Sequence, residues 1–107
     1  MDYINIVKGD LYRIRFHITN QDDEVVNLTD ADITLKAISK DGTTIVNGTC
    51  ESISDDYPLT DGYCCYQIKE DDFKVTGLYD AEIEIKWNTT GYILTCPNLE
   101  ILVLDEL

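Results

Sequence analysis

The sequence predicts an all-β protein, a sandwich of about seven antiparallel strands, and three observations support this prediction. Apolar residues recur with a period of two along most of the chain, as they do in strands with one buried and one solvated face. Long stretches with the helical recurrence of apolar residues are missing. Turn signals separate the alternating segments within 107 residues, which is the length of one domain. We therefore expect a single immunoglobulin-like sandwich over residues 1–107.

The strands are expected in order at residues 3–7, 12–18, 33–37, 44–50, 62–68, 79–87 and 92–103. Asp41-Gly42 predicts a tight hairpin between the third and fourth strands, because glycine adopts the positive φ angles that such turns require. Residues 69–73 are expected to close one short helical turn. In the last strand the apolar phase changes around Pro97, which lacks an amide N–H, so we expect a bulge there.

The inward positions of these strands define the predicted core, which comprises Ile14, Phe16, Ile33, Leu35, Tyr66, Ile83, Ile85 and Trp87. Gly77-Leu78-Tyr79 has the spacing of a tyrosine corner, in which a tyrosine near the start of the sixth strand donates a hydrogen bond to the backbone upstream. A core tyrosine without that bond is the alternative, and the sequence favours neither.

The charge balance excludes two classes of partner. Asp and Glu number 21 against 8 Lys and Arg, for a formal net charge of -13. Phosphate backbones and anionic membrane surfaces repel such a chain, so we expect neither nucleic acid nor membrane as a partner. No stretch approaches the roughly 20 apolar residues of a membrane span. Met1 opens into a strand-like pattern without the regions of a signal peptide, so a secreted precursor is not expected.

The four cysteines are Cys50, Cys64, Cys65 and Cys96, and no Cys-x-x-Cys spacing occurs among them. With His17 as the only histidine, a zinc site is not expected. Cys64 and Cys65 are neighbours in a predicted strand and point to opposite faces, so at most one of them joins the core. We favour buried free thiols over a structural disulfide.

No constellation of residues predicts catalysis or a cofactor. His17 lies between Phe16 and Ile18 on the solvated phase of its strand, which is typical of an exposed histidine. No glycine-rich phosphate loop follows a strand and opens a helix. The acidic clusters at 22–24, 55–56 and 70–72 offer hard oxygen ligands, and calcium between two such loops is physically reasonable. None has the EF-hand spacing, so we favour solvated turns and expect no metal.

The candidate partner contact is Tyr57-Pro58-Leu59, which interrupts an otherwise polar and acidic loop over residues 51–61. Loops at the end of a sandwich commonly carry contacts, and an aromatic beside a proline offers a large surface at little entropic cost. The alternative is that Tyr57 and Leu59 plug the open end of the sandwich, and the sequence leaves both interpretations open.

Several short motifs carry a family resemblance over nearly the whole chain. They are Lys8-Gly9-Asp10 before the Ile14, Phe16 and Ile18 strand, Asn27-Leu28-Thr29-Asp30-Ala31, Asp61-Gly62, and Gly77-Leu78-Tyr79-Asp80-Ala81-Glu82-Ile83. The chain resembles the immunoglobulin-like N-terminal domain of the tailed-phage baseplate upper protein family. Asp23-Glu24-Val25 stands where that family usually has a glycine in its second turn. The resemblance implies a virion structural module that docks onto a larger phage assembly and has no catalytic residues to carry over.

The leading hypothesis is a non-enzymatic phage virion structural protein, made in the bacterial host cytoplasm. Because no coiled-coil or receptor-binding extension follows Leu107, we expect a small accessory protein on the capsid surface or a head fibre. A baseplate or tail attachment module and a stand-alone acidic binding or adhesion module are the alternatives. A DNA mimic is a third, with Asp80, Glu82 and Glu84 on one strand face as its signal. The expected partners are capsid, head-fibre or baseplate subunits.

Overall fold

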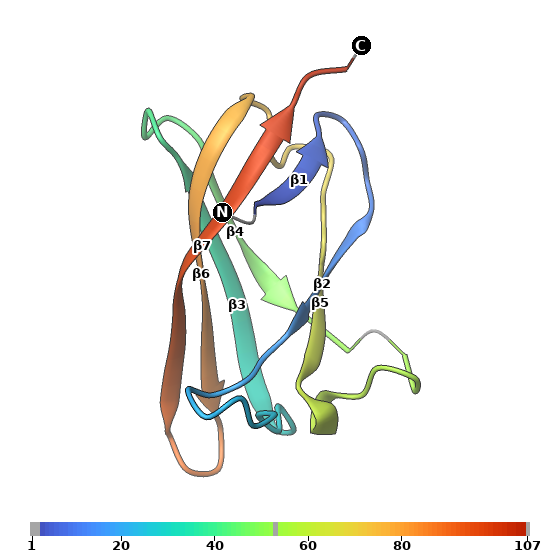
Figure 1. Cartoon of the computed structure of the whole chain (residues 1–107), viewed down its shortest axis with the longest axis vertical. Coiled ribbons are helices and arrows are strands. Elements are labelled where there is room, and N and C mark those ends of the chain that lie inside the picture. The colour runs from blue at the N-terminus through green and yellow to red at the C-terminus, as the bar shows by residue number, and fades with distance from the viewer. Residues whose placement is uncertain (1–2, 53, 107) are drawn as a thin grey trace.

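The computed structural model describes residues 3–52 and 54–106, in which seven strands form two sheets (Figure 1). The strands are β1 (Ile4–Val7), β2 (Arg13–His17), β3 (Ala31–Ser39), β4 (Ile45–Cys50), β5 (Tyr63–Gln67), β6 (Gly77–Trp87) and β7 (Ile93–Leu104). One sheet has the order β1-β7-β6-β3-β4, and the other pairs β2 with β5. The predicted all-β sandwich is confirmed.

One pairing differs from the fully antiparallel sandwich that we predicted. β1 runs parallel to β7, with Ile4 opposite Ile101 and Val7 opposite Leu104. The chain follows the outer edge of β7 and then turns towards the other sheet after Lys8, whose N–H donates to the Leu104 carbonyl at 2.8 Å. Because β1 and β7 are not consecutive in sequence, no hairpin forces them to run in opposite directions.

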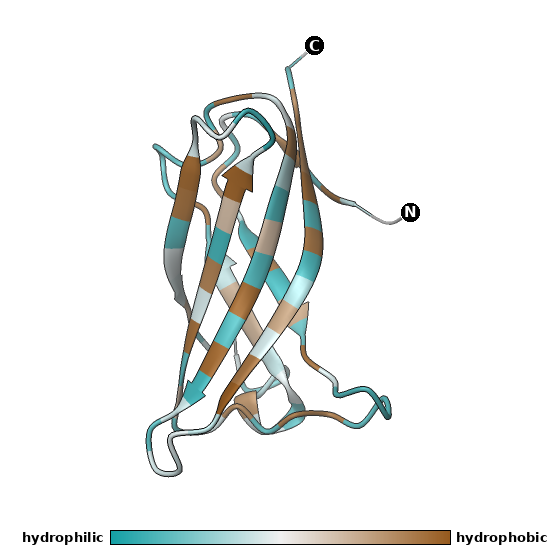
Figure 2. Cartoon of the chain, turned by 90° about the vertical axis from the view of Figure 1, so that its left-hand side faces the viewer, coloured by the Kyte–Doolittle hydropathy of each residue, from teal (hydrophilic) through white to brown (hydrophobic). Residues whose placement is uncertain are grey.

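Alternation along the strands separates core from solvent. In β6, Tyr79 and Ile83 are fully buried, whereas the residues that directly follow them, Asp80 and Glu84, are exposed. Figure 2 shows the matching bands of hydrophobic and hydrophilic residues along the five-stranded sheet. The predicted core residues that are buried are Ile14, Phe16, Ile33, Leu35, Tyr66, Ile83 and Ile85. Their inward placement is confirmed.

Trp87 is half-buried rather than fully inside as predicted. It packs against the core at the end of β6 and donates its indole N–H to the Asn27 carbonyl at 3.0 Å. A tryptophan needs a partner for that N–H, which explains why the ring stays at the end of the sandwich.

Tyr79 forms the tyrosine corner that its spacing permits. Its hydroxyl donates to the Val75 carbonyl at 2.7 Å, and its side chain is fully buried. The Phe73 ring meets the Tyr79 ring edge-on, with centroids 5.3 Å apart. Burial raises the pKa of Tyr79, so its hydroxyl keeps the proton that it donates. The corner therefore fastens the start of β6 to the chain that precedes it.

The helical turn predicted over residues 69–73 is wrong. The Asp72 N–H donates to the Lys69 carbonyl, and the Asp72 carboxylate accepts the Lys69 N–H, both at 2.9 Å. Phe73 then adopts a φ of 53°, which ends any helical course and sends its ring into the core. The one helical turn in the described residues is the 3-10 helix η1 (Leu59–Asp61), where only a loop was expected.

A bulge interrupts β7 at the predicted proline. Ala81 pairs with Leu99 and Ile83 pairs with Cys96, so the single residue Glu82 faces both Pro97 and Asn98. Asn98 takes a φ of 64°, a left-handed conformation that asparagine tolerates. The extra residue restores the inward phase of the strand, because Ile101 and Val103 are buried beyond it.

The β3–β4 hairpin is held by Asp41. Its carboxylate accepts hydrogen bonds from the Ser39 hydroxyl at 2.6 Å, from the Thr43 hydroxyl at 2.7 Å and from the Thr43 N–H at 3.0 Å. These donors lower the pKa of Asp41 to about 2. Gly42 supplies the positive φ of 77° that the predicted turn requires.

The four cysteines are free thiols. Cys50 of β4 and Cys64 of β5 both lie in the core. The neighbouring Cys64 thiol and burial raise the pKa of Cys50, so its thiol stays protonated. Cys65 points to the opposite face from Cys64 and lies outside the main core cluster, as predicted. It is nevertheless only 5 % exposed, because it also pairs with Glu51.

We expect protein made in a reducing cytoplasm to keep all four thiols reduced. Alkylation after denaturation should then add four groups to the intact mass. The melting temperature should be the same with and without reductant, because none of the core packing depends on a covalent bridge. A mass lower by two hydrogens, together with a melting temperature that falls in reductant, would contradict this expectation.

Candidate interaction surface

The predicted contact residues of the loop between β4 and β5 differ in how deeply they are buried. Leu59 is half-buried against the core, and its carbonyl accepts the Leu28 N–H at 2.9 Å. Tyr57 is 37 % exposed, after a tight turn in which its N–H donates to the Ser54 carbonyl at 3.1 Å. Pro58 is half-buried between them. Leu59 thus plugs the sandwich, as the alternative interpretation predicts, while Tyr57 stays at the surface.

Gly62 sets the geometry where this loop enters β5. Its φ is 84°, and a Cβ at this position would lie 2.7 Å from the Ile18 carbonyl oxygen and 3.2 Å from that of Val26. Real Cβ atoms do not approach backbone oxygens so closely, so only glycine fits. The close approach also allows the Ile18 N–H to donate to the Gly62 carbonyl at 2.8 Å. Gly62 thereby fixes Tyr63 directly opposite His17.

Aromatic and cationic side chains stack on the outer face of the β2–β5 sheet. The His17 and Tyr63 rings are nearly parallel, with centroids 4.2 Å apart and an angle of 11°. Tyr57 meets Tyr63 edge-on at 5.2 Å. The Arg15 guanidinium carbon lies 4.3 Å from the Tyr57 centroid, within the range of a cation–π contact. We call Arg13, Arg15, His17, Tyr57 and Tyr63 the arginine–tyrosine surface.

The arginine–tyrosine surface contains a concentration of basic side chains, which are few in this acidic chain. Both arginines and the only histidine lie on β2, in a protein of net charge -13. The two ion pairs in the described part of the chain are Lys40–Asp80 and Lys74–Asp71, so neither arginine is paired with a carboxylate. The alternation of apolar residues predicted only that this phase of β2 faces solvent. No local pattern relates Arg15 to Tyr57, because the two residues are far apart in sequence.

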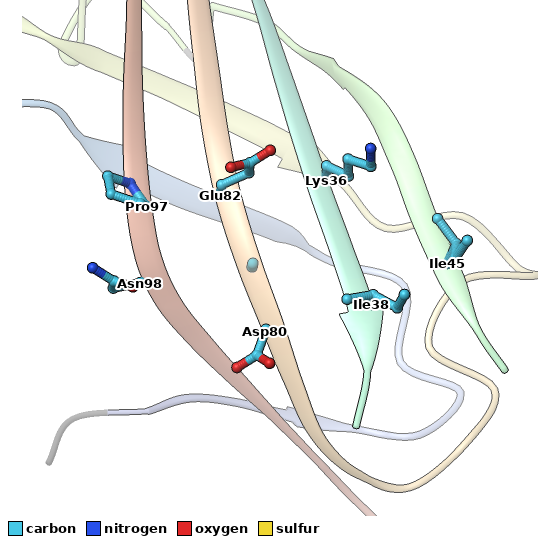
Figure 3. A pocket seen from close by; sticks show the side chains of 8 residues that line it. Lys36, Ile38, Ile45, Asp80, Glu82, Pro97 and Asn98 are labelled. Atoms are coloured by element: carbon cyan, nitrogen blue, oxygen red, sulfur yellow. The ribbon is translucent and has the colours of Figure 1, made fainter. Parts of the chain in front are cut away.

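A second open surface lies on the outer face of the five-stranded sheet. It is a shallow hollow of about 550 Å³ across β3, β4, β6 and β7 (Figure 3). Ile38 and Ile45 form its apolar part and are 40 % and 61 % exposed. Pro97 and Asn98 of the bulge border it from β7, as Figure 3 shows. The hollow is apolar on one side and charged on the other, with no nucleophile paired to a base.

The acidic row on β6 is interleaved with lysines. Glu82 faces Lys36 across the β3–β6 ladder. Asp80 accepts two hydrogen bonds from the Lys40 ammonium, at 2.9 and 3.0 Å. A DNA mimic needs an uninterrupted array of carboxylates, so this pairing does not favour that hypothesis.

Local hydrogen bonds close the acidic turn over residues 20–24. In the turn over residues 20–24, the Asn20 side chain accepts the N–H groups of Asp22 and Glu24 at 2.9 and 3.0 Å. Within the described ranges, no group of three or more His, Cys, Asp or Glu side chains is arranged to hold a metal ion. No helix among the same residues is long and apolar enough to cross a membrane.

The fold and these open surfaces define a β-sandwich module that presents faces rather than a cleft. The chain matches the BppU N-terminal domain over residues 2–105. It therefore belongs to the family of the baseplate upper protein N-terminal domain, as the resemblance implied. This is a phage baseplate structural family and not an enzymatic one. Membership makes the chain a phage structural module whose family implies other phage structural proteins as partners.

A solved structure shares the fold. The N-terminal domain of phage TP901-1 ORF48 superposes with a TM-score of 0.67, covering 99% of this chain and 86% of that chain at 10% sequence identity. No curated protein matches the chain. In the second turn, where the resemblance led us to expect a glycine, Asp23 adopts a left-handed φ of 59°. Aspartate tolerates this conformation better than most residues, so the turn keeps its shape without the glycine.

Proposed function

We propose that this chain is a non-enzymatic attachment module of a phage particle, which docks one structural protein onto another. The observation that carries the proposal is the family match over residues 2–105. Membership of a baseplate family supports a place in the baseplate. The capsid-surface or head-fibre location expected from the sequence stays a prediction, because a sandwich with open faces suits either location.

We propose further that Tyr57 is an anchor of the docking surface. Its ring is exposed, is held by the Arg15 guanidinium and leans on Tyr63, so it loses little conformational freedom on binding. Tyrosine and arginine are enriched among the residues that dominate binding energy at protein interfaces. Pro58 and Leu59 contribute by fixing the loop, since Leu59 is packed on the core.

The location is tested on particles that contain a tagged copy of the chain. Particles purified by density gradient are analysed by quantitative mass spectrometry, and the tag is located by gold labelling in the electron microscope. We expect the chain in purified particles, with label at the tail end. Label on the head would favour the capsid or head-fibre location, and absence from particles would overturn the attachment function.

Replacing Tyr57 with alanine should weaken incorporation into particles while barely changing the stability of the isolated protein. The loss of an exposed cation–π contact costs about 0.5–1 kcal/mol. Emptying a core aromatic site would instead cost roughly 3–5 kcal/mol. Denaturant unfolding and the amount of the variant per particle check the two parts of this prediction.

Tyr92→Ala is the matched control, because Tyr92 is 72% exposed and lies in the β6–β7 turn away from this surface. It should leave both the stability and the incorporation unchanged. A large loss of stability in Tyr57→Ala would show that the loop is structural. Equal incorporation of the two variants would place the interface elsewhere.

A further inference from the structure

β2 lies at an edge of the small sheet. Its one strand neighbour among the described residues is β5. The Ile18 N–H donates to the Gly62 carbonyl at 2.8 Å, and the Ile68 N–H donates to the Tyr12 carbonyl at 3.1 Å. In an antiparallel ladder, residues alternate between pairs that exchange hydrogen bonds and pairs that do not. The even-numbered residues of this strand therefore direct their backbone groups towards β5.

The odd-numbered residues Arg13, Arg15 and His17 direct their backbone N–H and C=O groups away from β5. In the described chain, no backbone hydrogen bond joins these groups to another segment. The hairpin that follows does not cover them, because its bond from the Val26 N–H goes to the even-numbered Ile18 at 3.0 Å. β2 thus presents a row of free donors and acceptors, the arrangement to which an additional strand binds.

The side chains of the same three residues point to the outer face of the sheet. The Arg15 guanidinium makes no hydrogen bond or ion pair with any described residue and rests on Tyr57. Arg13 donates from Nε to the Gln67 side chain at 3.3 Å, which leaves its terminal nitrogens without a partner in the described chain. The His17 Nε2 lies 3.0 Å from the Asp61 carbonyl oxygen. The free backbone edge therefore coincides with the chain's concentration of unpaired cationic donors.

We propose that the free edge of β2 binds an extended, acidic segment of a partner protein, which becomes the third strand of the β2–β5 sheet. The inference rests on the proposed attachment function and names the chemistry of its partner. The segment's backbone bonds to Arg13, Arg15 and His17. Its residues directly opposite these three have their side chains on the same outer face, roughly 5 Å away between Cβ atoms. Carboxylates at alternate positions of the segment then meet the guanidinium groups.

The same charges disfavour a second copy of this chain as the occupant. Antiparallel pairing of two β2 strands centred on Arg15 would place arginine opposite arginine, and like charges directly opposite one another are destabilising. An arginine binds a carboxylate through two parallel N–H···O bonds, which selects an acidic strand over a neutral one. The edge is thus protected from self-association and open to an acidic partner.

A peptide titration tests the edge directly. The probe is acetyl-Thr-Glu-Thr-Glu-Thr-Glu-Thr-amide, and the control peptide has lysine in place of glutamate. Titration into the full ¹⁵N-labelled chain at low salt should shift the amides of Arg13, Arg15 and His17 first. Affinity for the glutamate peptide should exceed that for the lysine peptide by about tenfold or more and should fall with added salt.

Three variants separate charge from backbone. Arg15→Glu should weaken peptide binding by about tenfold or more. Arg15→Ala and Arg15→Pro both remove the guanidinium, but only the proline removes the edge N–H, at a position where an edge strand tolerates it. Arg15→Pro should therefore bind several-fold more weakly than Arg15→Ala, with both folded by circular dichroism. Lys36→Glu, on the other sheet, should bind as the wild type does.

The outcomes distinguish this inference from the attachment function. Absence of shifts in β2, or binding that Arg15→Glu leaves unchanged, would overturn the strand-addition proposal. If Arg15→Pro is also incorporated into particles as well as the wild type, attachment stands and uses another surface. If the wild-type chain is missing from particles, the attachment function itself fails, whatever the peptide does.

Discussion

Replacing Ile83 with aspartate should leave no soluble folded protein. Ile83 is fully buried in the middle of β6, opposite Leu35 of β3 and Cys96 of β7. An aspartate there would be an unpaired charge between the two sheets, with no cationic group among those neighbours and only the weak thiol donor of Cys96. The cost of burying such a charge exceeds the stability of a small domain, which is roughly 5–15 kcal/mol.

The measurement is the soluble fraction on expression, followed by circular dichroism of whatever is recovered. Ile83→Val is the conservative control and should fold with a loss of about 0.5–1.5 kcal/mol. Glu84→Ala, one residue along on the exposed face, should behave as the wild type does. A soluble and cooperatively folded Ile83→Asp protein would contradict the placement of this side chain between the sheets.

Gly62→Ala should destabilise the protein by several kcal/mol and disturb the arginine–tyrosine surface as well. Two penalties combine at this position. A left-handed φ of 84° costs an alanine about 1–2 kcal/mol. The added Cβ would also lie 2.7 Å from the Ile18 carbonyl oxygen, so the backbone that joins β2 to the start of β5 must move. Because His17 and Tyr63 adjoin this contact, their ring stacking should loosen with it.

Gly42→Ala separates the two penalties, because Gly42 has a similar φ of 77° but no atom within 4 Å of the position that a Cβ would take. Gly42→Ala should lower the free energy of unfolding only by the cost of the left-handed backbone conformation, about 1–2 kcal/mol. Denaturant unfolding compares the two variants, and ¹⁵N-detected shifts report on the loop that contains Tyr57. Equal destabilisation of Gly62→Ala and Gly42→Ala would show that the approach of Gly62 to Ile18 is not tight in solution.

The tertiary structure separates the three candidate contact residues of the loop between β4 and β5. Its sequence presents Tyr57, Pro58 and Leu59 as one apolar group, yet the fold divides them between two tasks. Leu59 packs against the core at the start of the 3-10 turn η1, while the exposed Tyr57 lies beside Arg15. If Tyr57 is the anchor that we propose, this support leaves little to order when a partner binds, so more of the contact energy appears as affinity.

The strands, their faces and most of the core could be predicted from the sequence. The period-two alternation around Ile83 identifies a buried face without reference to any other strand, because the pleat sends neighbouring side chains to opposite sides. Pro97 likewise acts through local geometry, and the bulge lies where it was expected, whereas the Gly77-Leu78-Tyr79 spacing left the corner open until the structure showed its hydrogen bond. The resemblance carried by the short motifs agrees with the family match over residues 2–105.

Which distant segments meet could be learned only from the folded chain. The parallel pairing of β1 with β7, the burial of Cys50 and Cys64 in one core and the stacking of Arg15 on Tyr57 all bring together residues that no local pattern relates. Strand order depends on the free energy of packing one whole face against another, and alternation along a single strand contains no information about its neighbour. For that reason, the free edge of β2 and the lack of partners for its arginines can be recognised only in the folded structure.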